Sequence, residues 1–504
     1  MSLMRQSIHL SKTATNCIGN SERANRQEPI RSGPPNRMND LAYRDWMKFQ
    51  KSFFWFTSSQ ALIEECIRFF TKSIWPDGTP SRSLIIGFDD FDKKRIPEPR
   101  IIVSSRHLLS LKDVISDLTQ RVRNGEEYDF IVVNLQKIMD SEERLLQFLH
   151  AESEDFFESI RKLLRSQRYC GILTNPLKSS GDFPIPWSIG SSGRSQLKLR
   201  DEKVGLVADL KQIYYLIFFQ AEPDRRLPMV LSPPALSRTK EKLPELPLWI
   251  IPKPPARRKQ ELVHPGKFPE ILVSTFIKIF SKAGDTIFDP MVGTGSTLIA
   301  ALRSGRNGVG VELNPQFIKI ARERLFKESP TPLIEDSKRP KFRLIQGDAS
   351  HLNDISELAT AQFAYCVTSP PYWSVLKNRG SEYQRSRRVK GLPLFYSDDK
   401  RDLGNIENYE DFLIALSNIY RQVAEKLSSK GYLTIVVKNV KRHHVLYTLA
   451  WDLLQELSSS THAFDYVGTT LWCQDDISLK PFALGTHWVS NTLHQYCLHF
   501  RKKS

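Results

Sequence analysis

Short apolar runs alternate with amphipathic stretches in two separate blocks of the chain. The period-2 and continuous apolar runs predict strands, and the spacing of three to four residues predicts helices. In the first block we expect strands at 84–88, 100–103, 129–135, 171–174 and 213–219, and helices at 61–70 and 156–164. In the second block we expect a strand that ends at Asp289, strands at 308–312, 342–347, 363–367, 430–438, 466–472 and 492–500, and helices at 298–302, 317–325, 409–427 and 446–457. This alternation predicts an α/β fold for both blocks.

Composition divides the chain into four segments. A length of 504 residues exceeds one ordinary domain, so we expect at least two. Residues 1–37 are polar and predict a disordered tail, and residues 222–260 are rich in proline and predict a linker. The predicted domains are therefore an α/β accessory domain at 38–221 and a second α/β domain at 261–504.

Three acidic residues follow successive predicted strands of the second block: Asp289, Glu312 and Asp348. Gly293 and Gly295 come shortly after the first acid, where they permit close approach of backbone and ligand. Glu312 lies 23 residues beyond Asp289 and suits a pair of ribose hydroxyls. Because the carboxyl ends of parallel strands meet in one crevice, we expect a nucleotide-type ligand there, with Asp348 facing its adenine ring. A Gly-x-Gly loop alone would be weak evidence.

The turn Ser369-Pro370-Pro371-Tyr372 follows a fourth predicted strand, and the prolines stop that strand. The amino group of cytosine or adenine is a poor nucleophile because its lone pair is delocalised into the ring. The Ser369 hydroxyl and the Pro370 carbonyl could accept hydrogen bonds from such an amino group, and Tyr372 could stack on a base extruded from the duplex. An ordinary Pro-Pro turn would explain this motif equally well if it stood alone. The ordered set of acids upstream favours the chemical interpretation.

The segment from His264 to Phe500 resembles the DNA amino-methyltransferase family, which makes N4-methylcytosine or N6-methyladenine with S-adenosylmethionine. The resemblance implies a doubly wound, Rossmann-like methyltransferase sheet that ends in an antiparallel hairpin. It also implies the S-adenosylmethionine site and the catalytic turn. The implied cofactor residues are His264, Asp289, Gly293, Gly295, Ser296, Thr297, Glu312, Asn314 and Asp348, and the implied catalytic residues are Ser369, Pro370, Pro371 and Tyr372.

The resemblance implies a cofactor segment that precedes the catalytic segment. A serine at position 369 favours cytosine N4 as the target, while adenine N6 remains open. An RNA amino-methyltransferase and a catalytically silent DNA-binding subunit also remain open. The accessory block has neither a glycine loop nor a Pro-Pro-Tyr turn, so it is either a degenerate methyltransferase-like domain or an unrelated α/β domain.

A formal net charge of +16 suits a polyanionic partner, and we expect double-stranded DNA. A cognate restriction or defence component is a further expected partner. The predicted DNA contacts are the basic residues of the loop after the catalytic turn: Lys377, Arg379, Arg385, Arg387 and Arg388. Six scattered cysteines without Cys-x-x-Cys spacing predict neither a metal site nor disulfides. Without a long apolar run or a secretory pattern, we expect a cytoplasmic protein that does not bind membranes.

Overall fold

The computed structural model places most of the chain after residue 37. All described residues belong to a unit that runs from Arg37 to Ser504. The described ranges are 38–88, 91–105, 110–136, 138–139, 141–175, 185–209, 211–222, 243–253, 268–328, 339–373, 388–389, 399–442, 445–458, 463–475, 479 and 488–503. The predicted segment boundaries at 37, 221 and 260 lie in or beside the gaps between these ranges, so the four-segment division stays a prediction.

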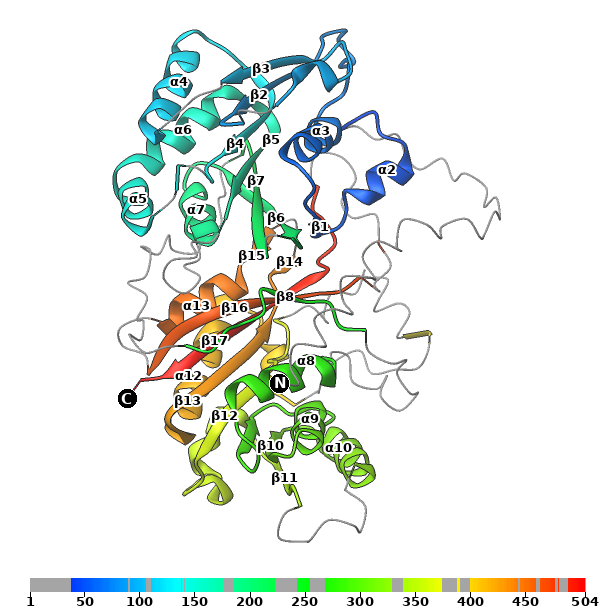
Figure 1. Ribbon diagram of the computed structural model, residues 1–504, viewed down its shortest axis with the longest axis vertical. Helices are drawn as coiled ribbons and strands as arrows, with labels where there is room; N and C mark the ends of the chain where they lie inside the picture. Colours follow the sequence, from blue (N-terminus) through cyan, green and yellow to red (C-terminus); the bar gives the residue numbers. More distant parts are fainter. Residues whose placement is uncertain are drawn as a thin grey trace. The chain divides into compact units, whose positions relative to one another are not determined.

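The first block forms a seven-stranded mixed sheet (Figure 1). Its strands are β1 (Phe53–Trp55), β2 (Arg82–Ile86), β3 (Ile101–Ser105), β4 (Tyr128–Asn134), β5 (Leu164–Thr174), β6 (Lys198–Val207) and β7 (Gln212–Gln220). Their spatial order is β1-β6-β7-β5-β4-β2-β3. Every residue of β4 is buried, which agrees with its continuous apolar run and its place inside the sheet.

Helices cover both faces of this first sheet. They are α2 (Tyr43–Lys48), α3 (Ser59–Phe70), α4 (Leu111–Arg123), α5 (Glu142–Gln147), α6 (Ser153–Leu163) and α7 (Ile185–Gly193). Alternate residues of a strand point to opposite faces. Val132 of β4 packs in one core with α3, while Ile131 and Val133 pack in another core with α4, α6 and α7. The predicted second α/β sheet is thus present and sandwiched between helices.

The second block forms an eight-stranded sheet. Its strands are β8 (Trp249–Ile250), β9 (Thr286–Asp289), β10 (Asn307–Glu312), β11 (Phe342–Gln346), β12 (Phe363–Thr368), β13 (Leu427–Val437), β16 (Phe464–Cys473) and β17 (His494–Lys502). The order is β11-β10-β9-β12-β13-β17-β16-β8. β9 to β13 are parallel, and β13, β17 and β16 are antiparallel neighbours. The doubly wound sheet and its terminal antiparallel pair are therefore confirmed, while the edge strand β8 was not predicted.

Helices also cover both faces of the second sheet. They are α8 (Glu270–Phe280), α9 (Ser296–Arg303), α10 (Pro315–Lys327), α12 (Tyr409–Lys426) and α13 (Leu449–Ser458). α8 packs with Ile287, Tyr365 and Val367 on one face of the sheet. On the other face, α12 and α13 pack with the strand residues whose side chains point the opposite way. A separate two-stranded ribbon joins β14 (Val440–Arg442) and β15 (Val445–Tyr447). Within the described residues, no helix is long and apolar enough to cross a bilayer.

Strand β9 lies between β10 and β12, and the chain moves outward from β9 in both directions. This reversal is the switch point of a doubly wound sheet, where loops diverge and leave a crevice beyond the carboxyl ends of the strands. Asp289 and Glu312 end two of these strands, and Ser369 follows the third. The topology therefore brings the predicted acids and the catalytic turn to one place.

Candidate active site

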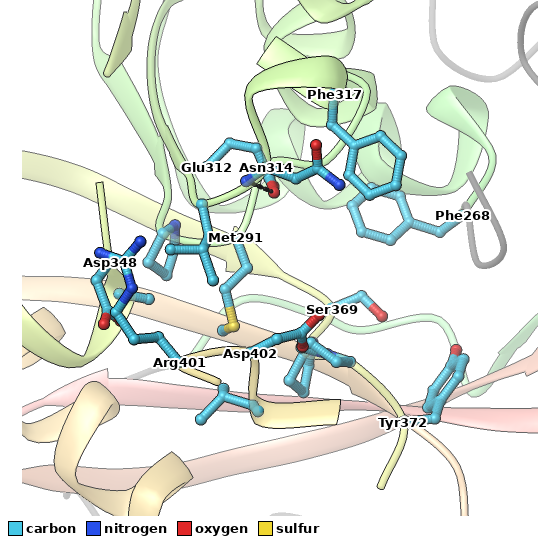
Figure 2. A pocket seen from close by; sticks show the side chains of 16 residues that line it. Phe268, Met291, Glu312, Asn314, Phe317, Asp348, Ser369, Tyr372, Arg401 and Asp402 are labelled. Carbon is cyan, nitrogen blue, oxygen red and sulfur yellow. Dashed lines mark hydrogen bonds between the residues drawn. The ribbon is translucent and has the colours of Figure 1, made fainter. Parts of the chain in front are cut away.

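A pocket opens at this switch point (Figure 2). It encloses about 750 Å³, including space open to solvent. Glu312 and Asn314 lie across the pocket from Ser369 and Tyr372. The lining consists of Phe268, Pro290, Met291, Glu312, Leu313, Asn314, Phe317, Asp348, Ala349, Ser369, Pro370, Pro371, Tyr372, Arg401, Asp402 and Leu403. Predicted cofactor residues and the whole catalytic turn thus face a common space.

Glu312 fastens the glycine loop to the end of β10. One carboxylate oxygen accepts a hydrogen bond from the Gly293 backbone N–H at 2.8 Å, and the other accepts from the Asn314 N–H at 2.9 Å. Burial raises the pKa of Glu312 to about 7, against the effect of these two bonds. Each oxygen keeps a second lone pair, so the carboxylate can still accept from hydroxyl groups in the pocket.

Asp289 is hydrogen-bonded within the protein at the end of β9. Its carboxylate accepts from Thr297 Oγ1 at 2.5 Å, from Thr368 Oγ1 at 2.7 Å and from the Met291 N–H at 3.0 Å. Burial raises its pKa to about 6. Its side chain is 1 % exposed and is not among the residues that line the pocket. Asp289 therefore joins the cofactor loop to the strand that carries the catalytic turn.

The loop residues 293 and 295–297 shape the pocket from behind its lining. Gly295 has a φ of +87° and forms the N-cap of α9. A Cβ at this position would lie 3.2 Å from the Cβ of Ala321, so glycine serves both the left-handed backbone and the packing of α9 on α10. The Ser296 hydroxyl lies 3.5 Å from Glu270, and the Thr297 hydroxyl bonds Asp289. These side chains are turned toward the protein.

The remaining acid, Asp348, lines the pocket beyond β11. It caps a 3-10 helix (Ala349–Asp354) by accepting from the Ser350 N–H at 2.8 Å. Phe317, from the start of α10, and Asp402 also face the pocket. The sequence patterns assigned no role to these two residues, or to Phe268, Met291, Arg401 and Leu403. Asp402 caps a short 3-10 helix (Leu403–Asn405) by accepting from the Gly404 N–H. The only sequence pattern that could mark this segment is the capping residue itself.

The catalytic turn has a defined arrangement of hydrogen-bond donors. The Ser369 hydroxyl donates to the Val436 backbone carbonyl at 3.0 Å. A serine hydroxyl has one proton to donate, so toward the pocket this oxygen can only accept while the bond is made. The Pro370 carbonyl is likewise only an acceptor. Both groups are therefore suited to accept from a ligand that carries an N–H donor.

The Tyr372 ring is held from two sides. Its hydroxyl donates to Gln495 Oε1, and the Lys438 ammonium lies 4.4 Å from the ring centroid. Burial raises the pKa of Tyr372 to about 12 and lowers that of Lys438 to about 8. A neutral phenol in a fixed orientation is suited to stacking on a planar ligand.

Several predicted residues lie outside the described part of the chain: His264, Lys377, Arg379, Arg385 and Arg387. Arg388 is described and is exposed. In the described part of the chain, no group of three or more His, Cys, Asp or Glu side chains could hold a metal ion.

A doubly wound sheet, a glycine loop and acids at the carboxyl ends of β9, β10 and β11 define the S-adenosylmethionine-dependent methyltransferase class of fold. Residues 207–323 match the model of a family described as DNA methylase. This segment includes the glycine loop, β9, β10 and the first part of α10, so a part of the chain that forms the pocket is similar to DNA methylases. S-adenosylmethionine is the cofactor of that family, and the residues of the pocket fit it: two acids suit hydroxyl and amino donors, and Phe317 offers a ring face.

Three named methyltransferases are similar to parts of the chain. Type II methyltransferase M2.DpnII of Streptococcus pneumoniae is 43% identical over 68 residues, which is 14% of this chain and 25% of the relative. Type II methyltransferase M.ScaI of Streptomyces caespitosus is 27% identical over 152 residues, or 29% of this chain and 50% of the relative. DNA adenine methyltransferase YhdJ of Escherichia coli K12 is 31% identical over 111 residues, or 22% and 37%. The matches span a quarter to a half of these relatives.

Proposed function

We propose that this protein transfers a methyl group from S-adenosylmethionine to the exocyclic N4 amino group of cytosine within a specific sequence of double-stranded DNA. The observation that carries the proposal is the hydrogen bond from Ser369 to the Val436 carbonyl. It leaves the serine hydroxyl only its capacity to accept, in a pocket that Ser369 and Pro370 line together with Glu312 and Asp348. An amino group supplies the two N–H donors that such a pair of acceptors requires.

The residues of the turn would activate the amino group. Two hydrogen bonds, to Ser369 Oγ and to the Pro370 carbonyl, favour a pyramidal nitrogen whose lone pair is free to attack. The same acceptors stabilise the positive charge that grows on nitrogen during transfer. Tyr372 stacks on the extruded base and fixes its plane, so that the reacting atoms are held about 3 Å apart. S-adenosylmethionine, when bound, supplies an electrophilic methyl group on a sulfonium.

The cofactor residues divide into two groups in this proposal. Glu312 and Asp348 contact the cofactor directly, with Glu312 on the ribose hydroxyls and Asp348 on the adenine. Asn314 lies beside Glu312 in the pocket lining. The loop residues Asp289, Gly293, Gly295, Ser296 and Thr297 give the pocket its shape, and His264 belongs to the segment before α8 that helps to hold the methionine carboxylate.

The basic loop after the turn is proposed to contact DNA phosphates through Lys377, Arg379, Arg385, Arg387 and Arg388. Its position directly after the base pocket supports this assignment, together with the net charge of +16. A restriction or defence role is also proposed, because two of the relatives are named type II methyltransferases. Sequencing host DNA for modified bases with and without the protein tests that role.

Adenine N6 is the second candidate target, since adenine presents an equivalent amino group and one relative is named a DNA adenine methyltransferase. The deciding experiment incubates the full chain with isotopically labelled S-adenosylmethionine and duplex DNA, digests the product to nucleosides and identifies the labelled nucleoside by mass. Labelled N4-methylcytosine supports the proposal, and labelled N6-methyladenine replaces it with the second candidate. Ser369→Ala serves as the matched control and should lose most of the transfer.

The same assay also tests for an RNA substrate and for a protein without catalytic activity. Preferential labelling of RNA over duplex DNA would identify an RNA amino-methyltransferase. Duplex DNA binding without any labelled product, combined with failure to bind S-adenosylhomocysteine, would identify a silent DNA-binding subunit.

A further inference from the structure

The two sheets of the chain have the same topology. In chain order, β1 to β7 correspond to β8, β9, β10, β12, β13, β16 and β17. The spatial order of the first sheet, β1-β6-β7-β5-β4-β2-β3, corresponds strand by strand to β8-β16-β17-β13-β12-β9-β10, and only β11 is left over. Every neighbouring pair is parallel in both sheets or antiparallel in both sheets.

The irregularities of the two sheets also coincide. In both sheets a bulge lies at the start of one strand, β5 after α6 and β13 after α12, where a step of two residues in the neighbouring strand corresponds to a step of five. The pairs that bracket it are Tyr128 with Leu164 and Phe130 with Tyr169 in the first sheet, and Phe363 with Leu427 and Tyr365 with Tyr432 in the second. Each bulge has a left-handed residue at its fourth position, Gln167 and Lys430, both with a φ of 61°. A second register shift falls at matching places, between Leu199 and Asp201 and between Tyr466 and Gly468. Such bulges are specific features of a fold, so their coincidence indicates one architecture used twice.

The matched registers show what the first sheet lacks. Ile85 of β2 is the equivalent of Asp289 of β9. Each directly follows the strand residue whose partner in the neighbouring strand, β4 or β12, is equivalent in the two sheets. Asn134 takes the place of Ser369, since they lie four residues after the matched Phe130 and Tyr365. Between residues 86 and 105 the chain has a single glycine, so no Gly-x-Gly loop follows β2. The cofactor and base chemistry of the second sheet is thus missing from the first.

We call residues 38–222, which form the first sheet and its helices, the first unit, and the part that forms the second sheet the second unit. Equivalent elements of these two units pack on each other. Trp187 is the third residue of α7, and Trp451 is the third residue of the corresponding helix α13. Their rings stack at 5.8 Å with an interplanar angle of 19°. A Cβ on Gly190 would lie 2.5 Å from the Trp451 ring, so the glycine permits this approach. Contact between equivalent residues is the signature of a two-fold symmetric dimer interface.

A buried carboxylate of the first unit reaches the active-site strands of the second. Glu202 of β6 is 3 % exposed. Its Oε1 accepts a hydrogen bond from Asn439 Nδ2 at 3.1 Å and another from the Tyr496 hydroxyl. Asn439 directly follows Lys438, which lies over the Tyr372 ring, and Tyr496 directly follows Gln495, which accepts from the Tyr372 hydroxyl. Glu202 thus binds Asn439 and Tyr496, and each of these is next in sequence to a residue that contacts Tyr372.

We propose that residues 38–222 are a methyltransferase-type unit without a cofactor site of its own, which serves as a built-in partner subunit and positions the base-stacking Tyr372 through Glu202. Glu202 is a positioning residue in this proposal, since it acts through Asn439 and Tyr496. The inference rests on the proposed function, because Tyr372 has a task to be positioned for only if the second unit binds a base.

Cofactor stoichiometry tests the loss of the first site. Titration of the full chain with S-adenosylhomocysteine in a calorimeter should give one site per chain, and two sites per chain would overturn the proposal. A chain that binds none would contradict the proposed function itself, which separates the two failures.

Turnover of Glu202 variants tests the positioning role. Glu202→Leu removes the shared acceptor, and a displacement of Tyr372 on the order of 1 Å should lower kcat by about ten- to a hundredfold with unchanged affinity for S-adenosylhomocysteine. Glu202→Gln keeps an oxygen that can accept from Asn439 and Tyr496. Its NH2 group takes the position of Oε2, which has no partner among the described residues. We therefore expect kcat of this variant to lie within about twofold of wild type. Such rescue would not follow from a purely electrostatic role.

Asp129→Leu is the matched control, since it also replaces a fully buried carboxylate of the first unit, one that pairs with Arg165 and Arg168. It should lower the melting temperature without lowering kcat. An equal loss of kcat in Asp129→Leu and Glu202→Leu, or wild-type kcat in Glu202→Leu, overturns the positioning role. If Glu202→Leu does not fold, Tyr496→Phe takes its place, with a severalfold lower kcat expected and an unchanged kcat decisive against the proposal.

Discussion

The substitution Glu312→Gln separates the charge of this residue from its shape. Both carboxylate oxygens of Glu312 accept from a backbone N–H, one from Gly293 and one from Asn314. Glutamine has one oxygen and one NH2 group, so one of the two backbone donors must face another donor. The variant therefore retains the volume of the side chain but loses a hydrogen bond at a buried position and the negative charge in the pocket.

The structure sets the size of the effect. A buried donor left without its partner costs about 1–3 kcal/mol, and hydrogen bonds to a charged acceptor contribute about 1.5–3 kcal/mol. Part of this cost falls on folding, and the rest falls on cofactor binding. We expect the affinity for S-adenosylhomocysteine to fall by about ten- to a hundredfold, since each 1.4 kcal/mol corresponds to a factor of about ten.

The raised pKa of Glu312 adds a pH dependence with a definite sign. With a pKa of about 7, the carboxyl is mostly protonated at pH 6 and mostly ionised at pH 8. If the ribose hydroxyls bind the ionised form, wild-type affinity should rise about tenfold from pH 6 to pH 8. Folding has the opposite dependence. The folded state holds this proton from the ordinary value of 4.5 up to about 7, so the free energy of unfolding falls as pH rises through that window.

Isothermal titration of wild type and Glu312→Gln with S-adenosylhomocysteine at pH 6, 7 and 8 measures both effects. The variant should bind more weakly at pH 8, and the difference should narrow toward pH 6. Thermal unfolding at each pH checks that the variant is folded. Equal affinity of the two proteins at pH 8, or a wild-type affinity that is flat between pH 6 and 8, would refute the assignment of Glu312 to the ribose.

Three further substitutions follow from the contacts of the site. Tyr372→Ala should lower methyl transfer by about 5- to 150-fold, since stacking on a base contributes about 1–3 kcal/mol; calorimetry should show unchanged cofactor affinity, and undiminished transfer would exclude the stacking role. Asp289→Ala should weaken cofactor binding and lower the melting temperature together, because the residue joins Thr297 to Thr368; normal affinity in calorimetry would show that the loop keeps its shape without it. Gly295→Ala should destabilise the protein by about 1–3 kcal/mol in denaturant unfolding because of its left-handed backbone, and an unchanged midpoint would contradict that reason.

Local patterns predicted the elements that line the pocket. The apolar run before Glu312 and the prolines after Thr368 each define where a strand ends, and parallel strands must bring those ends together. The sequence therefore sufficed for every strand of the second sheet except β8, and for the place of the Ser369–Tyr372 turn. The two-residue strand β8 carries too short a pattern to be recognised, and in the structure it pairs with β16 at the edge of the sheet.

The roles of individual site residues depended on partners distant in the chain. Asp289 was predicted at the cofactor site, and no local pattern showed that its carboxylate bonds Thr368, which is 79 residues away. Gln495 binds the Tyr372 hydroxyl across 123 residues, and no periodicity marks it. The equivalence of the two sheets was equally hidden, because bulges and register shifts are properties of strand pairing and leave no fixed repeat in the sequence.

Under the proposed function, the hydrogen bond from Ser369 to the Val436 carbonyl determines which bases the pocket would reject. Thymine and uracil carry a carbonyl oxygen where cytosine has its amino group. Guanine carries a carbonyl oxygen where adenine has its amino group. Such an oxygen would meet the lone pairs of Ser369 and Pro370 and find no proton between them. Sites built around a buried hydrogen-bonding group discriminate strongly against ligands that leave it unpaired. A single backbone carbonyl on the neighbouring strand, by occupying the serine proton, would thus exclude keto bases from this position.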